Sequence, residues 1–375
     1  MGDEVRATGD LDSAHDRRPL RRSPWGRRSP YGSGFRDGPG GDRTTYAALD
    51  LGTNNCRLLV ARPTGDSFRV IDAFSRIIRL GEGISASGRI SDAAITRAVD
   101  ALGICRDKMK NRGVTRARLI ATEACRTAVN GGEFRARITE EVGLDLEIID
   151  RETEAELAAT GCTPLLDPDA DGVILFDIGG GSSELVRLGR SAPCRRGPPL
   201  PEIKAWASMP VGVVTLAERH GGHNVTRDVY EAMVTEVAGH LAPFVAGNDF
   251  PAVDRMHLLG TSGTVTTIAG VYLELKRYDR RRVDGCWMSD DQASMVVERL
   301  IEMSYEERVA NPCIGSERAD LVLAGCAILE AIRREFPCRR LRVADRGLRE
   351  GMLVQMMRAD GVWGRPPGFG GAHAP

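Results

Sequence analysis

The chain has 375 residues, which is longer than a typical single domain and favours two domains around a cleft. Its formal net charge of -1 argues against a general or sequence-specific nucleic-acid-binding protein, because such proteins usually carry a large basic excess. Hydrophobic residues make up 42% and aromatic residues 5% of the chain, which is typical of an Ala-, Val- and Leu-rich α/β protein and excludes disorder of the whole chain.

The nine cysteines are dispersed, without CxxC pairs or matching histidine spacing. This pattern predicts reduced thiols in the core of a cytosolic protein and argues against a disulfide framework or a zinc site. The N-terminus has no apolar signal-peptide core, and the chain contains no run of 18 or more apolar residues. We therefore expect a cytoplasmic protein without a membrane span.

Composition divides the chain into four segments. Residues 1–43 are rich in Arg, Gly, Pro and Ser and predict a disordered Arg/Gly-rich tail, and residues 359–375 predict a second disordered tail. Between them we expect a first domain over residues 44–165 and a second over residues 166–358. The final helix is expected to pack back on the first domain.

Turn residues and apolar periodicity predict a similar order of elements in both domains. In the first domain we expect strands at 46–51, 56–62, 68–74, 118–122 and 146–150, with helices at 92–112 and 132–142. In the second we expect strands at 173–177, 184–188, 205–210, 256–260 and 341–344, with helices at 226–245, 265–275, 290–303 and 316–336. The two domains thus repeat one another in outline.

Each domain opens with an acidic residue at the end of a strand, followed by a glycine-rich turn. The two sets are Asp50 with Gly52, Thr53 and Asn54, and Asp177 with Gly179, Gly180, Gly181 and Ser182. Glycine lets backbone N–H groups converge on phosphate oxygens, and the aspartate can hold Mg²⁺. Twin turns that face each other across a cleft are a feature of the actin-like superfamily. The repeat predicts phosphate chemistry and leaves kinase, ATPase and phosphatase activities open.

A third turn stands where a strand gives way to a helix, and it contains Gly260, Ser262, Gly263 and Thr264. Helix N-termini bind anions readily, so this turn is a further candidate for phosphate contact. Taken alone, the same residues would suit a tight connection between a strand and a helix. The two other turns make phosphate contact the better interpretation.

Several carboxylates lie at a strand-to-helix junction between the domains. On a helix, Glu152 and Glu156 share one face, whereas Glu154 points roughly opposite. Most such residues are solvated side chains at a helix N-terminus. A carboxylate that faces a phosphate site can instead orient or deprotonate a water for hydrolysis.

Taken in order, these motifs resemble the Ppx/GppA exopolyphosphatase and guanosine pentaphosphate phosphohydrolase family over residues 45–358. The matching stretches are 48–54, 121–128 with Asn130, 147–149 with Glu154 and Ala155, 177–185, 260–264 and 348–351. The resemblance implies an α/β fold of two actin-like (ribonuclease H-like) half-domains with a cleft between them. The chain is similar to the short two-domain form, because longer relatives append helical domains. Without those domains, a long polyphosphate groove would be built by the core or by a homodimer.

The resemblance implies hydrolysis of terminal phosphate from inorganic polyphosphate, guanosine pentaphosphate or both. It implies Glu154 as the general base, Asp177 and Glu184 as catalytic and metal-binding acids, and Mg²⁺ or Mn²⁺ held by these two residues with Asp50. The implied phosphate-binding residues are Gly52, Thr53, Asn54, Arg57, Arg126, Gly179, Gly180, Gly181, Ser182, Gly260, Ser262, Gly263 and Thr264.

Four positions depart from the family pattern. Asn55 stands where Ser is frequent, Thr153 stands where another Glu is common, and Arg346-Gly347 replaces a Gly-Ala pair. These differences leave open the choice between polyphosphate and guanosine pentaphosphate. Two other functions also remain open, namely an actin-like sugar kinase or ATPase and a non-catalytic sensor that binds an alarmone nucleotide.

Overall fold

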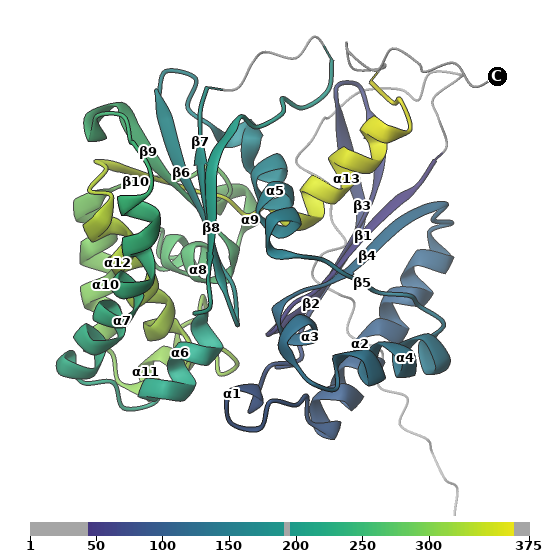
Figure 1. Cartoon of the computed structure of the whole chain (residues 1–375), viewed down its shortest axis with the longest axis horizontal. Helices are drawn as coiled ribbons and strands as arrows, with labels where there is room; N and C mark the ends of the chain where they lie inside the picture. The colour runs from purple at the N-terminus through teal and green to yellow at the C-terminus, as the bar shows by residue number, and fades with distance from the viewer. Residues whose placement is uncertain (1–43, 191–195, 364–375) are drawn as a thin grey trace, which may run out of the picture.

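The computed structural model describes residues 44–190 and 196–363 (Figure 1). The predicted N-terminal tail, residues 1–43, and residues 364–375 of the predicted C-terminal tail lie outside the described residues. The described chain continues past the predicted end of the second domain. Trp363 is 6% exposed, and its Nε1 donates to the carbonyl oxygen of Gly65 at 3.0 Å.

The first half of the molecule is built on a five-stranded sheet of order β3-β2-β1-β4-β5. Strand β1 is antiparallel to β2 and parallel to β4. The predicted strands and helices occur in the predicted order, with the short helices α1 and α3 in addition. The elements are β1 (Tyr46–Leu51), β2 (Asn55–Thr64), β3 (Ser67–Ile77), α1 (Ile84–Ser87), α2 (Asp92–Asn111), β4 (Arg116–Ala121), α3 (Glu123–Thr127), α4 (Gly131–Val142), β5 (Glu147–Ile148), α5 (Arg151–Cys162) and η1 (Thr163–Leu165).

The second half is built on a six-stranded sheet of order β10-β11-β9-β6-β7-β8. Its elements are β6 (Gly172–Ile178), β7 (Ser183–Leu188), β8 (Ile203–Met209), α6 (Val213–His220), α7 (Arg227–Ala246), η2 (Val253–Arg255), β9 (Met256–Thr261), α8 (Ser262–Tyr272), α9 (Arg280–Val283), β10 (Trp287–Ser289), α10 (Asp290–Glu302), α11 (Tyr305–Ala310), α12 (Val322–Glu335), β11 (Arg340–Val343) and α13 (Leu348–Ala359).

The two sheets repeat the same hairpin in the same register. Asp50 lies opposite Arg57 in the first hairpin, and Asp177 lies opposite Glu184 in the second. The tips match as well, since Gly52 N donates to Asn55 O at 2.9 Å and Gly179 N donates to Ser182 O at 3.0 Å. In each half the first strand also pairs in parallel with a later one, β1 with β4 and β6 with β9. The predicted α/β fold of two related half-domains is confirmed.

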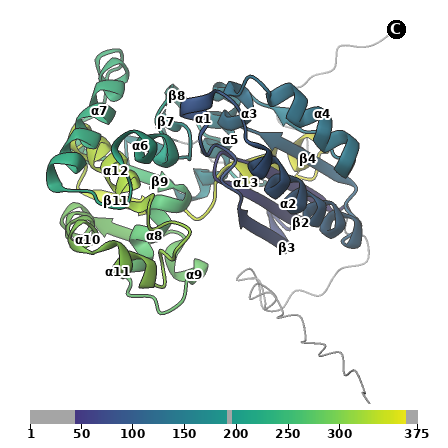
Figure 2. The same cartoon turned by 90° about the horizontal axis from the view of Figure 1, so that it is seen from below.

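Helices α5 and α13 lie between the two sheets (Figures 1 and 2). They share one apolar core with the facing sides of both sheets, including Leu59 of β2 and Leu175 of β6. The helices touch at glycines: a Cβ on Gly161 would lie 2.0 Å from Gly347 O, and a Cβ on Gly351 would lie 2.1 Å from Leu157 O. Only glycine allows this approach, so α13 supports α5 directly.

One predicted helix begins later than expected. The sequence predicted a helix over 316–336, whereas α12 begins at Val322. Gly315 adopts a left-handed conformation, with φ at 75°, and the chain then forms consecutive turns, such as Leu321 N to Arg318 O at 2.9 Å. These turns place residues 317–322 beside the cleft described below. Helix α6 was not predicted.

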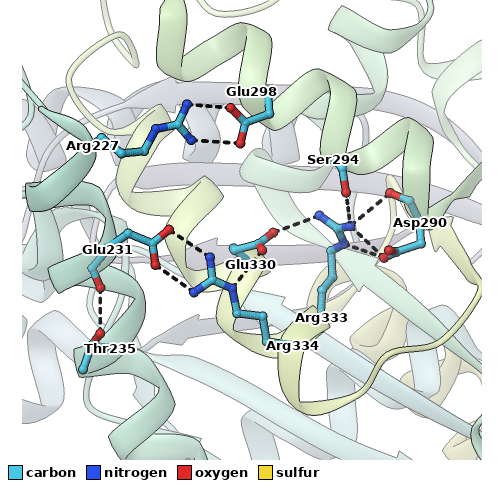
Figure 3. Close-up of polar contacts among 9 residues, drawn as sticks. All are labelled: Arg227, Glu231, Thr235, Asp290, Ser294, Glu298, Glu330, Arg333 and Arg334. Carbon is cyan, nitrogen blue, oxygen red and sulfur yellow. Dashed lines mark hydrogen bonds and ion pairs between the residues drawn. The ribbon is translucent and has the colours of Figure 1, made fainter.

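Outer helices of the second half are joined by an ion-pair network (Figure 3). Arg333 of α12 is 6% exposed at its side chain, and it binds Asp290 of α10 at 2.7 Å and Glu330 at 2.9 Å. Arg334 binds Glu231 of α7 at 2.8 Å. The network connects α7, α10 and α12, which cover one face of the second sheet.

The described part of the chain contains eight cysteines, all free thiols, and seven of them are buried. Cys56 and Cys105 come closest, with their sulfur atoms 3.9 Å apart and not bonded. Seven of these eight residues therefore lie in the core, as predicted, and none of the eight forms a disulfide. Over the same residues, no helix combines the length and the apolar character needed to cross a membrane.

Candidate active site

A cleft lies where the ends of β1 and β6 meet the N-termini of α5 and α8. Nearly all the predicted site residues line it. They are Asp50, Gly52, Thr53, Asn54 and Arg57 from the first hairpin, Glu154 from α5, Asp177, Gly179, Gly180, Gly181, Ser182 and Glu184 from the second hairpin, and Ser262, Gly263 and Thr264 from the start of α8.

The two glycine-rich turns touch each other across this cleft. A Cβ on Gly180 would lie 2.9 Å from Thr53 Cβ, and one on Gly181 would lie 2.9 Å from Thr53 Oγ1. Behind the second turn, a Cβ on Gly212 would lie 2.4 Å from the Gly180 carbonyl carbon. Glycine is therefore required at these positions by close packing as well as by access for a ligand.

Glu154 enters the cleft from the first turn of α5. Asp150 caps this helix by accepting a hydrogen bond from Thr153 N at 2.7 Å, and this fixes where the helix begins. Glu154 then faces inward at 7% exposure, while Glu152 and Glu156 are exposed, as their spacing predicted. Its Oε2 accepts from Arg126 Nη2 at 3.1 Å.

Burial and the neighbouring carboxylate of Glu184 raise the pKa of Glu154 well above its usual value, and Arg126 opposes this rise. The pKa of Glu184 itself is raised to about 7, by burial first and by Asp177 second. Glu184 Oε1 accepts hydrogen bonds from Ser182 Oγ at 2.7 Å and from Ser208 Oγ at 2.9 Å, which favour its charged form. The three carboxylates are therefore one interacting group.

The start of α8 holds Asp177. Ser262 adopts a left-handed conformation, with φ at 75°, and its Oγ donates to Asp177 Oδ1. Such backbone strain is uncommon for a residue with a side chain and gathers at functional sites. Burial raises the pKa of Asp177 despite this bond. The third predicted turn thus contributes to the cleft through Ser262, Gly263 and Thr264.

The acidic residues of the cleft could supply some of the oxygen ligands of a divalent cation, and a bound substrate could supply others. Burial raises the pKa of Asp50, Arg57 and Arg349 oppose this rise, and the charge of Asp177 adds to it. A bound cation would favour the charged form of both carboxylates.

Asn54 and Asn55 each keep a buried side-chain oxygen without a hydrogen-bond partner. Within the described ranges, no three His, Cys, Asp or Glu residues form a metal cage. Mg²⁺ often completes its ligand sphere with water and substrate phosphates.

Two arginines line the cleft without a salt bridge among the described residues, Arg57 and Arg318. Arg57 lies opposite Asp50 in the hairpin. Arg318 makes one hydrogen bond, from Nη1 to Thr267 Oγ1 at 3.4 Å, and burial lowers its pKa. The charge of Arg57 lowers the pKa of Asp50 and Asp177, so this arginine already has carboxylates near it. Arg318 is more deeply buried without an ion pair, which is costly and favours an anionic ligand.

Two predicted phosphate contacts do not line the cleft. Arg126 directs its guanidinium to Glu123, Glu154 and the Ile149 carbonyl oxygen, and its Nε lies 3.0 Å from Glu123 Oε2. It therefore positions carboxylates. Gly260 lies inside β9, where a Cβ would be 2.5 Å from Phe176 Cζ, so this glycine is required by packing.

Two charged residues that line the cleft were not assigned from the sequence, Glu123 and Arg318. Glu123 follows β4 as Ser262 follows β9, so it stands near the equivalent of the third turn in the first half. No glycine marks it there, but the comparison of the two halves and the family-like stretch 121–128 both contain a signal for it. Arg318 carried no local signal, because it comes from turns that were predicted as helix.

The sequence matches the Ppx/GppA phosphatase family over residues 59–360. Exopolyphosphatase 2 of Mycobacterium tuberculosis is 29% identical over 328 residues, which cover 84% of this chain and 98% of that protein. The guanosine-5'-triphosphate,3'-diphosphate pyrophosphatase of Photobacterium profundum is 26% identical over 83% of this chain, and the match covers 59% of that longer protein.

Solved structures agree with these matches. The crystal structure of the Aquifex aeolicus member of the Ppx/GppA family is 28% identical, with a TM-score of 0.69 over 84% of this chain and 98% of that one. An exopolyphosphatase from Cytophaga hutchinsonii, 24% identical, has the same fold, with a TM-score of 0.75 over 84% and 98%. With a family match that spans most of its length and an actin-like fold shared with family structures, the chain belongs to the Ppx/GppA phosphatase family.

Proposed function

We propose that this protein hydrolyses the terminal phosphate of inorganic polyphosphate, of guanosine pentaphosphate or of both. The observation that carries the proposal is the position of Glu154, a buried carboxylate that faces two touching glycine-rich turns in one cleft. The relatives named as an exopolyphosphatase and as a guanosine-5'-triphosphate,3'-diphosphate pyrophosphatase support this class of substrate.

Glu154 is the general base in this proposal. Its carboxylate accepts a proton from the attacking water, and Arg126 keeps the carboxylate oriented toward the cleft. The raised pKa makes Glu154 a stronger base than an exposed glutamate, provided that a cation or Arg126 keeps it ionised at neutral pH. In this proposal Glu154 is basic enough to accept the proton of the attacking water, and the contact with Arg126 fixes the direction of its carboxylate.

The rest of the cleft binds the phosphates. Backbone N–H groups of the two turns and the guanidinium groups of Arg57 and Arg318 neutralise the phosphoryl oxygens. Asp50, Asp177 and Glu184 would hold Mg²⁺ or Mn²⁺, which supplies positive charge for the phosphoryl group and the leaving oxygen. The unpaired arginines and the crowded carboxylates support an anion and a cation bound together.

The alternative functions predict different outcomes in one experiment. A sugar kinase or ATPase would use the same turns for ATP, and an alarmone sensor would bind its nucleotide without turnover. The Glu154 side chain in the cleft favours hydrolysis over both.

We also propose that the protein is cytoplasmic, because the eight described cysteines are free thiols.

A substrate panel tests the proposal. Purified protein is incubated with Mg²⁺ and with long polyphosphate, short polyphosphate, guanosine pentaphosphate or ATP, and phosphate release is measured with and without a chelator. We expect metal-dependent release from polyphosphate or guanosine pentaphosphate. Phosphoryl transfer from ATP without release from either polyanion would support the kinase, and binding without turnover would support the sensor.

A further inference from the structure

Two segments from opposite halves of the molecule meet at the edge of the cleft. Arg79 follows β3, and Asp320 precedes α12. Arg79 Nη1 donates to Asp320 Oδ2 at 2.9 Å, and Nη2 donates to Oδ1 at 3.0 Å. Nη2 also donates to the carbonyl oxygen of Glu317 at 3.1 Å. The arrangement is the two-pronged geometry in which an arginine–carboxylate pair is strongest.

The backbone of Arg79 is tied to the first phosphate turn. The carbonyl oxygen of Asn54 accepts hydrogen bonds from Ile78 N at 2.9 Å and from Arg79 N at 3.1 Å. Arg79 has a left-handed conformation, with φ at 45°, and Arg97 Nη2 donates to its carbonyl oxygen at 3.2 Å. Because these bonds fix the residue on the turn, the Arg79 side chain and Asn54 move together.

Asp320 is equally fixed to the other wall of the cleft. It lies two residues after Arg318, and the next residue, Leu321, also lines the cleft. Arg308, which is 2% exposed, donates from Nη1 to the carbonyl oxygen of Ala319 at 3.1 Å. The segment from Arg318 to Leu321 is therefore held as one unit.

A second contact joins the halves nearby. Gly83 N, just before α1, donates to Glu218 Oε1 of α6 at 2.8 Å. Helices α1 and α6 lie side by side at this edge of the molecule (Figures 1 and 2). Both contacts join the first half of the molecule to the second, and of these two the Arg79–Asp320 contact is an ion pair.

We propose that Arg79 and Asp320 form a latch that holds the two halves together across the cleft and thereby sets the Arg318 guanidinium at its distance from the first phosphate turn. Both are positioning residues, which act on the substrate through Asn54 and Arg318. A polyanion that contacts both walls favours the same arrangement, so the latch strengthens substrate binding and the substrate strengthens the latch. The effect on substrate rests on the proposed function, whereas the closure does not.

Two variants of similar shape test the latch, Arg79→Gln and Asp320→Asn, together with their double variant. We expect each single variant to increase the radius of gyration measured by small-angle X-ray scattering without ligand. For the substrate identified in the panel, we expect KM to rise about tenfold in each variant, with a smaller change in kcat. KM should rise no more in the double variant than in either single variant, because all three variants remove the same Arg79–Asp320 interaction.

Arg116→Gln is the matched control. Arg116 also makes a two-pronged pair, to Asp360, with Nε and Nη2 each 3.0 Å from a carboxylate oxygen, but it lies on β4 and does not line the cleft. We expect this variant to keep the wild-type radius of gyration and KM. An unchanged radius of gyration in both latch variants, or additive losses in the double variant, would overturn the latch. If the wild-type protein hydrolyses nothing in the panel, the proposed function fails, and scattering still decides the latch.

Discussion

The guanidinium of Arg126 binds two carboxylates at once: its Nη2 lies 3.1 Å from Glu154 Oε2, and its Nε lies 3.0 Å from Glu123 Oε2. Glu123 is held a second time, by Arg151 Nη2 at 2.8 Å. Only one of the two arginines therefore reaches the proposed base. Both arginines add positive charge beside these carboxylates, whereas Arg126 is the one that also orients Glu154.

Replacing Arg126 should weaken catalysis and shift its pH dependence. Arg126 lowers the pKa of Glu154, so its loss raises that pKa further and favours the protonated form of the proposed base. For Arg126→Gln we expect kcat at pH 7 to fall by about 10- to 100-fold, with the acidic limb of the pH profile moved upward. Arg151→Gln, which removes a contact to Glu123 alone, is the control. Equal shifts of the acidic limb in both variants would contradict the role given to Arg126.

The buried carboxylate of Glu184 predicts a pH-dependent stability. Its pKa is about 7 in the folded protein, against a usual value of 4.5. The folded state binds this proton more tightly than the unfolded state, so the stabilisation is complete below pH 4.5 and is lost as pH rises through about 7. The loss is on the order of 3 kcal/mol without metal.

Differential scanning fluorimetry between pH 5 and pH 8 can measure this loss. We expect the wild-type Tm to decline over this interval and Mg²⁺ to restore part of it at pH 8, because a cation compensates the buried charge. Glu184→Gln should show a flatter Tm profile and a smaller response to Mg²⁺. A variant profile as steep as that of the wild type would show that Glu184 does not carry the effect.

Adding one methyl group where α13 meets α5 should displace α5 and with it the side chain of Glu154. In Gly351→Ala the new Cβ would lie 2.1 Å from the Leu157 carbonyl oxygen, so the helix that carries Glu154 has to move. We expect the free energy of unfolding to fall by about 2 kcal/mol or more and kcat to fall with it.

Gly103→Ala is the matched control for this change. Gly103 lies inside α2, and a Cβ there meets nothing within 4 Å. Since alanine favours helix, this variant should gain about 0.5–1 kcal/mol of stability and keep its activity. Urea unfolding of both variants measures the difference. Similar stabilities for Gly351→Ala and Gly103→Ala would mean that the glycine contact is not tight in solution.

The sequence predicted the parts of the site that are local in the chain. Asp50 and Asp177 were found because an acidic strand end and a glycine turn form a short, repeated pattern, and the structure places both turns in one cleft. Spacing placed Glu154 on the helix face opposite Glu152 and Glu156, and the family resemblance identified it as the candidate base. These features depend on backbone conformation and periodicity, which neighbouring residues determine.

The parts that were not predicted depend on contacts between distant residues. Arg318 reaches the cleft because residues 316–321 form turns, and a helical pattern in the sequence hid this. Gly260 resembled a phosphate contact, yet its lack of a side chain makes room for Phe176. Arg126 had the right charge for phosphate, and only its distances to Glu123 and Glu154 show what it holds.

The central claim is that the carboxylate of Glu154 activates the attacking water. Glu154→Gln keeps the size of this buried side chain and removes its basicity, whereas Glu152→Gln makes the same change on the exposed face of α5, two residues away. The measurement is phosphate release with saturating Mg²⁺ and polyphosphate or guanosine pentaphosphate. We predict a loss of at least about 100-fold in kcat for Glu154→Gln and wild-type rates for Glu152→Gln. Equal rates for Glu154→Gln and the wild type would contradict the claim.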